Sequence, residues 1–239
     1  MHAGNELDLV VLDMAGTTIA DQGQVPAAML AALKAHGLTL SSDELTSVRG
    51  SSKREAIRSL VGPHRTAFAD AVYVTFRGEL VQRYAAAGVQ PIAGAAAVIR
   101  DLRARGVRVA LNTGFDRETA MLLLEAVGWA DGIVDTVVCG DDVRRGRPAP
   151  YLIHRAMETT GVTSVRKVAN VGDTTLDLWA GHNAGVRWNV GVLSGAHDRD
   201  MLAGAPGTHI IETLADLASV WDSPAAGLRS SGAPFPCSR

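Results

Sequence analysis

Residues 7–18 read Leu-Asp-Leu-Val-Val-Leu-Asp-Met-Ala-Gly-Thr-Thr, an apolar run that ends in an aspartate and a turn of small residues. A short run that is rich in Val and Leu and bounded by such a turn is typical of a strand buried on both faces. Strands of this kind belong to parallel sheets that carry helices on both sides. The stretch therefore predicts the first strand of an α/β sheet, with Asp13 at its carboxyl end.

The rest of the chain alternates between strand and helix patterns. Further apolar runs of the same type lie at residues 107–112, 133–139, 168–172 and 189–193. Apolar residues at three- and four-residue spacing, which indicate helices, lie at residues 95–105, 117–127, 149–160 and 176–184. This alternation favours βαβ units. We therefore expect a doubly wound, mostly parallel sheet, that is, a Rossmann-like α/β core.

Residues 23–89 interrupt this alternation with helical patterns alone. These patterns lie at residues 27–36, 42–48, 53–61 and 64–86, and Ser41 or Ser42 could serve as an N-cap. A helical block inserted after the first strand predicts an all-helical cap on a core of residues 1–22 and 90–222. Residues 223–239 are rich in Ser, Gly, Pro and Ala, which predicts a disordered tail.

The composition excludes several classes of protein. The 239 residues are 47% hydrophobic and 20% charged, with a net charge of -2, so no basic surface for nucleic acid or anionic membranes is expected. No run approaches the roughly 18 apolar residues of a membrane span, and the N-terminus lacks the basic start of a signal peptide. Two cysteines, Cys139 and Cys237, cannot make a disulfide framework. We expect a cytoplasmic protein without a nucleic-acid or membrane partner.

Polar and small residues follow three of the predicted strands. Asp13 leads into residues 14–18, residues 113–115 follow the second strand, and residues 172–177 follow the fourth. A basic loop at residues 146–150 leads into a predicted helix. Because ligands bind outside the carboxyl ends of strands in open parallel sheets, we expect these segments to converge on one crevice.

The residue types in this crevice suit a phosphoryl group and Mg²⁺. Magnesium prefers hard oxygen ligands and one or two carboxylates, which Asp13 and Asp173 can supply. The Thr113 hydroxyl and the Gly114 N–H can hold phosphoryl oxygens, and Arg147 can neutralise charge that grows in the transition state. A carboxylate such as Asp13 could itself attack phosphorus and form an aspartyl-phosphate.

Together, residues 13–18, the triplet 112–114, Arg147 and residues 172–177 resemble the four motifs of the haloacid dehalogenase-like hydrolases, in the same order across nearly the whole chain. The resemblance implies that Asp13 is the nucleophile and that Asp13, the Ala15 carbonyl and Asp173 hold Mg²⁺. It also implies substrate contacts and supporting residues in the same loops. The expected substrate contacts are Ala15, Gly16, Thr17, Gly114 and Phe115, and the expected supporting residues are Asp177 and Thr174.

Ala15 departs from most phosphatases of that family, which carry an aspartate two residues after the nucleophile. That aspartate gives a proton to the leaving oxygen. An alanine can donate nothing. Either the protein is impaired for phosphate esters, as a degenerate or regulatory member would be, or its leaving group needs no proton.

Lys53 offers a way to satisfy the second alternative. A lysine forms a Schiff base with a carbonyl, whereas an arginine stays protonated and cannot. An imine beside a carbon–phosphorus bond acts as an electron sink, so cleavage releases an enamine and no acid is needed at Ala15. The combination of Ala15, Arg147 and Lys53 resembles the phosphonatase-like branch of the family. This resemblance implies that Lys53 condenses with an aldehyde while Asp13 attacks phosphorus.

The match to that branch is incomplete. Ala56 stands where the branch has a histidine thought to move protons, and Phe115 stands where it has a tyrosine. Glu55 could replace the histidine or could be a surface charge. The expected substrate is therefore phosphonoacetaldehyde or a substituted 2-oxoethylphosphonate. Lys53 itself could form an imine, contact the substrate as a simple cation, or be a solvated lysine.

Three functions follow from these alternatives. The leading hypothesis is a magnesium-dependent hydrolase of carbon–phosphorus bonds. The second is a phosphate-ester phosphatase or phosphomutase, and the third is a non-catalytic phosphate-binding module. The resemblance also suggests a homodimer through the cap, for which the helix at residues 66–86 could provide the face. The chain has only three lysines, and we expect Lys34 and Lys167, but not Lys53, to be replaceable by arginine.

Overall fold

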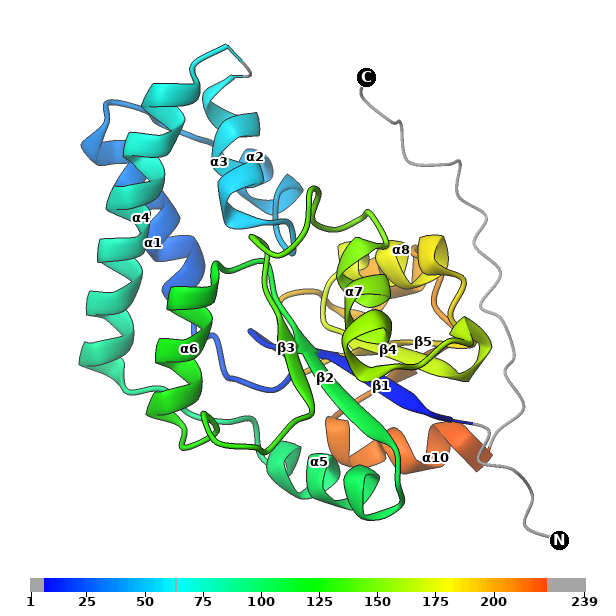
Figure 1. The fold of residues 1–239 in the computed structure, drawn as a ribbon. Helices are drawn as coiled ribbons and strands as arrows, with labels where there is room; N and C mark the ends of the chain where they lie inside the picture. Colours follow the sequence, from blue (N-terminus) through cyan, green and yellow to red (C-terminus); the bar gives the residue numbers. More distant parts are fainter. Residues whose placement is uncertain (1–6, 63, 223–239) are drawn as a thin grey trace, which may run out of the picture.

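Six parallel strands form one sheet in the computed structural model, which describes residues 7–62 and 64–222 (Figure 1). The strands lie in the order β3-β2-β1-β4-β5-β6. Their bounds are β1 Leu9–Asp13, β2 Arg108–Asn112, β3 Thr136–Val138, β4 Val168–Gly172, β5 Trp188–Val192 and β6 His209–Ile211. The predicted doubly wound parallel sheet is confirmed. The predicted tail at residues 223–239 lies outside the described residues.

Residues of β1 alternate between two helical layers. Val10 and Leu12 belong to the apolar cluster that includes α5 (Ala95–Ala104), α6 (Arg117–Ala126) and α10 (Leu217–Asp222). Leu9 and Val11 belong to the cluster that includes α7 (Tyr151–Thr160) and α8 (Thr175–Ala184). Because both faces are covered, every residue of β1 is buried, which explains its unbroken apolar run.

The structure corrects the predicted elements at two places in the core. The run at 133–139 forms a strand only over Thr136–Val138. The three-residue strand β6 and the short helix α9 (Arg199–Ala203) before it were not predicted. Elements this short contain too few residues to show a period of 2 or 3.6.

Four helices lie between β1 and α5, within residues 23–89, which we call the helical insert. They are α1 (Gln24–Ala35), α2 (Ser42–Ser47), α3 (Lys53–Val61) and α4 (Thr66–Ala87), with α4 packed along α1 and α3 (Figure 1). The helix α1 begins three residues earlier than predicted, because Pro26 is tolerated within a first turn. Ser41, one of the two predicted N-cap candidates, caps α2 through a reciprocal capping box with Glu44.

The two connections between sheet and insert lie side by side. The Ala20 N–H donates to the Gln90 carbonyl at 2.9 Å, and the Ile92 N–H donates to the Thr18 carbonyl at 2.9 Å. The residues that follow Asp13 are therefore fixed against the returning chain. The proposed division into a core of residues 1–22 and 90–222 and a separate cap stays a prediction.

The longest described helix is α4, with 22 residues. Its Val74 side chain is 68% exposed, and a homodimer through this helix stays a proposal. Among the helices of the described ranges, none combines the length and the apolar character that a membrane crossing requires.

Candidate active site

A cavity of about 270 Å³ lies where the loops after β1, β2 and β4 meet the helical insert. The predicted site residues that line it are Asp13, Ala15, Gly16, Lys53, Thr113, Gly114, Phe115, Arg147, Asp173 and Thr174. Thr17 and Asp177 do not line this cavity, because both are almost completely buried behind it. Residues from five separated stretches of the sequence thus share one site. Three of these stretches follow strands directly, as the strand-end rule predicts.

Arg147 is the buried cation of the site. One of its terminal nitrogens, Nη2, donates to Asp13 Oδ1 at 2.6 Å and to Asn112 Oδ1 at 2.6 Å. Burial raises the pKa of Asp13 to about 6, and the Arg147 charge opposes this rise. Asp13 is therefore mainly ionised at neutral pH, as a nucleophile must be.

Asp177 holds Arg147 from the opposite side. Its Oδ1 lies 2.9 Å from Arg147 Nε, and its Oδ2 accepts hydrogen bonds from the Thr174 hydroxyl at 2.5 Å and the Thr174 N–H at 3.1 Å. Thr174 in turn caps α8. The close packing requires Gly172, because a Cβ there would lie 2.2 Å from Asp177 Cγ. Asp177 therefore orients the guanidinium without reaching the cavity.

Three buried carboxylates form a cluster that suits a divalent cation. Oxygens of Asp13, Asp173 and Asp177 lie within 4.8 Å of one another. Asp173 Oδ2 accepts the Ala196 N–H at 2.7 Å, whereas the buried Asp173 Oδ1 has no hydrogen-bond partner among the described residues. Burial raises the pKa of Asp173 well above its usual range, and the neighbouring carboxylates add to the rise. Hard oxygen ligands and uncompensated negative charge are what Mg²⁺ requires.

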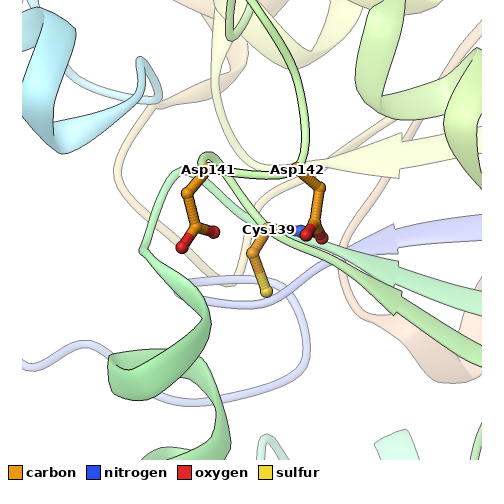
Figure 2. Close-up of side chains that lie close together, drawn as sticks. All are labelled: Cys139, Asp141 and Asp142. Atoms are coloured by element: carbon orange, nitrogen blue, oxygen red, sulfur yellow. The ribbon is translucent and has the colours of Figure 1, made fainter.

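A second group of potential metal ligands lacks such uncompensated negative charge. Figure 2 shows Cys139 beside Asp141 and Asp142 at the end of β3. Asp142 Oδ2 accepts the Cys139 N–H at 2.8 Å and pairs with Arg117 at 2.5 Å, and Asp141 accepts the Arg117 N–H at 3.1 Å. Burial raises the pKa of the Cys139 thiol to about 12. The carboxylates of Asp141 and Asp142 are thus engaged by the backbone of the turn and by Arg117, and Cys139 is a buried core residue.

Lys53 begins α3 and lines the same cavity as Asp13. Its N–H donates to the Gly114 carbonyl at 3.0 Å, and its Nζ lies 5.4 Å from the centre of the Phe115 ring. Burial lowers the pKa of Lys53, and the charge of Asp13 opposes this change. The interpretation of Lys53 as a solvated surface lysine is therefore wrong. Both remaining alternatives, imine formation and simple contact with an anion, fit this position.

Glycines allow the insert to approach the core loops. A Cβ on Gly114 would lie 2.5 Å from the Ser51 carbonyl oxygen, and a Cβ on Gly146 would lie 2.9 Å from the Ser52 Cβ. Neither glycine has a positive φ, so close approach is the reason that both positions lack a side chain. The turn at residues 50–53 thus rests directly on the loops that carry Thr113 and Arg147.

Several cavity residues were missed by sequence reasoning. Asp21 and Arg49 line the cavity, together with Gly195 and Ala196 in the loop after β5. The Ser194 hydroxyl in that loop donates to the Gly16 carbonyl at 2.8 Å. The missed signal is the run of small residues after β5, to which the strand-end rule applies as it does to the other strands. Asp21 and Arg49 had no such signal, because they lie in the connections to and within the insert.

Comparisons with known proteins agree with this geometry. Residues 7–185 match the family model described as haloacid dehalogenase-like hydrolase. A phosphonoacetaldehyde hydrolase from Nitratidesulfovibrio vulgaris is 28% identical, and the alignment covers 95% of this chain and 94% of the relative. Another from Paraburkholderia xenovorans is 30% identical, with 77% of this chain and 73% of the relative covered. The solved structure of a hydrolase from Pseudomonas syringae is 23% identical, has a TM-score of 0.81 and covers 92% of this chain and all of that one, which supports the fold.

Proposed function

Since the chain belongs to the haloacid dehalogenase-like hydrolases, we propose that it is a magnesium-dependent hydrolase of a carbon–phosphorus bond. The proposed substrate is phosphonoacetaldehyde or a close 2-oxoethylphosphonate analogue. The observation that carries this proposal is that Lys53 shares a cavity with Asp13 while Ala15 offers no general acid. Two relatives named phosphonoacetaldehyde hydrolase support the same substrate class.

The proposed reaction begins at Lys53. Its burial lowers the pKa of the ammonium group and so increases the fraction of neutral amine that can attack a carbonyl. Attack of the Nζ on the aldehyde carbon and loss of water give a protonated imine. The Phe115 ring beside Nζ stabilises the positive charge of that imine.

Phosphoryl transfer to Asp13 follows. A carboxylate oxygen of Asp13 attacks phosphorus, the carbon–phosphorus bond breaks, and its electron pair moves into the imine to form a neutral enamine. Because the leaving carbon becomes an enamine, no proton is required at Ala15 during cleavage. Protonation of the enamine carbon and hydrolysis of the imine release the aldehyde, and water hydrolyses the aspartyl-phosphate. Arg147 orients Asp13 and favours its ionised form before the attack and again after the aspartyl-phosphate is hydrolysed.

Asp13, Asp173 and the Ala15 carbonyl are the groups that would hold Mg²⁺, with Asp177 behind them. When bound, Mg²⁺ supplies positive charge that offsets the anionic phosphonate and the buried carboxylates. Thr113 and Gly114 line the same cavity, and the Thr113 hydroxyl and the Gly114 N–H are the proposed donors to phosphonate oxygens.

A phosphate-release screen tests the proposal. We expect release from phosphonoacetaldehyde or a substituted 2-oxoethylphosphonate, and little release from sugar phosphates. Rapid hydrolysis of phosphate esters alone would instead support the phosphatase or phosphomutase alternative. A protein that binds phosphate but turns over neither class would support the non-catalytic alternative.

A further inference from the structure

The side chain of Glu55 joins the helical insert to the loop that carries Arg147. Glu55 Oε2 accepts the Gly146 N–H at 2.9 Å, a bond between residues 91 positions apart in the sequence. Glu55 lies on α3, two residues after Lys53, and Gly146 immediately precedes Arg147. One hydrogen bond thus spans the two segments that provide the amine and the buried cation of the site.

The position of Glu55 does not suit proton transfer to the substrate. Glu55 lines two surface grooves outside the catalytic cavity, whereas Ala56, where the phosphonatase-like branch has a histidine, lines the cavity itself. The Glu55 carboxylate is also occupied by the Gly146 N–H. Lys53 and Ala56 therefore face the site, and Glu55 faces the joint between the insert and the core.

We propose that Glu55 is a positioning residue that fixes Lys53 relative to Arg147, and through Arg147 relative to Asp13. The contacts around it support this role. The Lys53 N–H donates to the Gly114 carbonyl at 3.0 Å, and Arg147 Nη1 donates to the Gly50 carbonyl at 3.4 Å. Both of these bonds use backbone acceptors. The Glu55 bond therefore gives a side-chain acceptor that can be changed without touching Lys53 or Arg147.

Close packing at Gly146 restricts the geometry of its hydrogen bond to Glu55. A Cβ on Gly146 would lie 2.8 Å from Glu55 Oε2 and 2.9 Å from the Ser52 Cβ. The loop can therefore approach α3 this closely only because residue 146 is a glycine. A loop that loses its acceptor at Glu55 keeps no other hydrogen bond from the Gly146 N–H among the described residues, so Arg147 loses one of its anchors.

Three substitutions at Glu55 separate positioning from charge and from proton transfer. Glu55→Gln keeps an acceptor oxygen at the same reach and removes the charge. Glu55→Asp keeps the charge and withdraws the oxygen by one methylene. Glu55→Ala removes both. Glu158→Gln is the control, because Glu158 is an exposed glutamate on α7 that pairs with Arg155 at 2.5 Å.

Two measurements are made on each variant: kcat and KM for phosphate release, and amide exchange of the peptide that contains Gly146. For Glu55→Ala and Glu55→Asp we expect kcat to fall and exchange to accelerate, each about ten-fold or more, the size expected for a hydrogen bond to a charged acceptor. We expect Glu55→Gln to stay within about three-fold of the wild type in both measurements, with an unchanged pH profile. The Glu158→Gln control should match the wild type.

The outcomes are distinguishable. If Glu55→Gln loses as much turnover as Glu55→Ala while its exchange stays normal, Glu55 transfers protons and the positioning role is wrong. If exchange at Gly146 is the same in Glu55→Ala and the wild type, the bond does not hold the loop and the role is again wrong. The kinetic arm rests on the proposed function. Should the wild type release no phosphate from any phosphonoaldehyde, that function fails, and the exchange arm still decides the positioning role.

Discussion

Replacement of Lys53 by arginine separates imine chemistry from simple binding. An arginine keeps the positive charge, and it can keep the contact with the Phe115 ring, which lies 5.4 Å from Nζ. The Lys53 N–H bond to Gly114 is a backbone bond and is unaffected. Binding and folding should therefore change by only about 1 kcal/mol, equivalent to roughly five-fold in KM and about 2–4 °C in Tm. Loss of a covalent intermediate should instead lower kcat by about 10⁴-fold or more.

The assay combines turnover with chemical trapping. Borohydride reduction in the presence of substrate should attach the product carbons to Lys53, which peptide mass spectrometry identifies among the three lysines of the chain. Lys34→Arg and Lys167→Arg are the matched controls, and we expect both to keep trapping and turnover. Neither of these lysines lines the cavity, and Lys167 pairs with Asp8 at 3.2 Å. A Lys53→Arg variant that keeps more than a tenth of the wild-type kcat would refute the imine mechanism.

Three further changes test the site. Gly114→Ala places a Cβ 2.5 Å from the Ser51 carbonyl oxygen, so kcat/KM should fall about 10- to 100-fold, and unchanged kinetics would contradict the close approach. Arg147→Met leaves two buried carboxylates unpaired and should lower stability by about 3–5 kcal/mol in chelator. Because the Arg147 charge then no longer opposes the rise that burial causes in the pKa of Asp13, thermal melts should show the deficit shrinking as pH falls. Asp173→Asn should weaken Mg²⁺ binding in calorimetry, and an unaltered affinity would exclude Asp173 as a ligand.

Most of the fold could be predicted because its signals are local. In β1, Val10 and Leu12 face one helical layer, and Leu9 and Val11 face the other. The strand therefore reads as an unbroken apolar run. The strands that were missed or misjudged lie at the two edges of the sheet, β3 and β6. An edge strand has one neighbour instead of two, and three residues pairing with a single partner need no long apolar run.

The strand-end rule predicts site residues only where they follow directly after a strand, whereas Lys53 was predicted from the resemblance to the phosphonatase-like branch. Asp13 and Asp173 end up in one cluster because β1 and β4 are adjacent and parallel, which the strand-end rule implies. The role of Glu55 could not be predicted, because its partner Gly146 is distant in sequence and uses a backbone group. Thr17 illustrates the opposite error: it lies within the first motif, yet its side chain is fully buried and does not line the cavity.

Burial shifts the pKa values of the two groups that we propose to react, Lys53 and Asp13, in opposite directions. It lowers the pKa of Lys53, which favours the neutral amine that attacks a carbonyl, and it raises the pKa of Asp13, which favours the unreactive acid. A cavity that desolvated both groups equally would help the first step and impede the second. Arg147 resolves this conflict because it lies 2.6 Å from Asp13 and draws the carboxyl back toward its ionised form. Asp177 and Asn112 hold Arg147 on the Asp13 side, so its charge acts on the carboxylate more than on the amine.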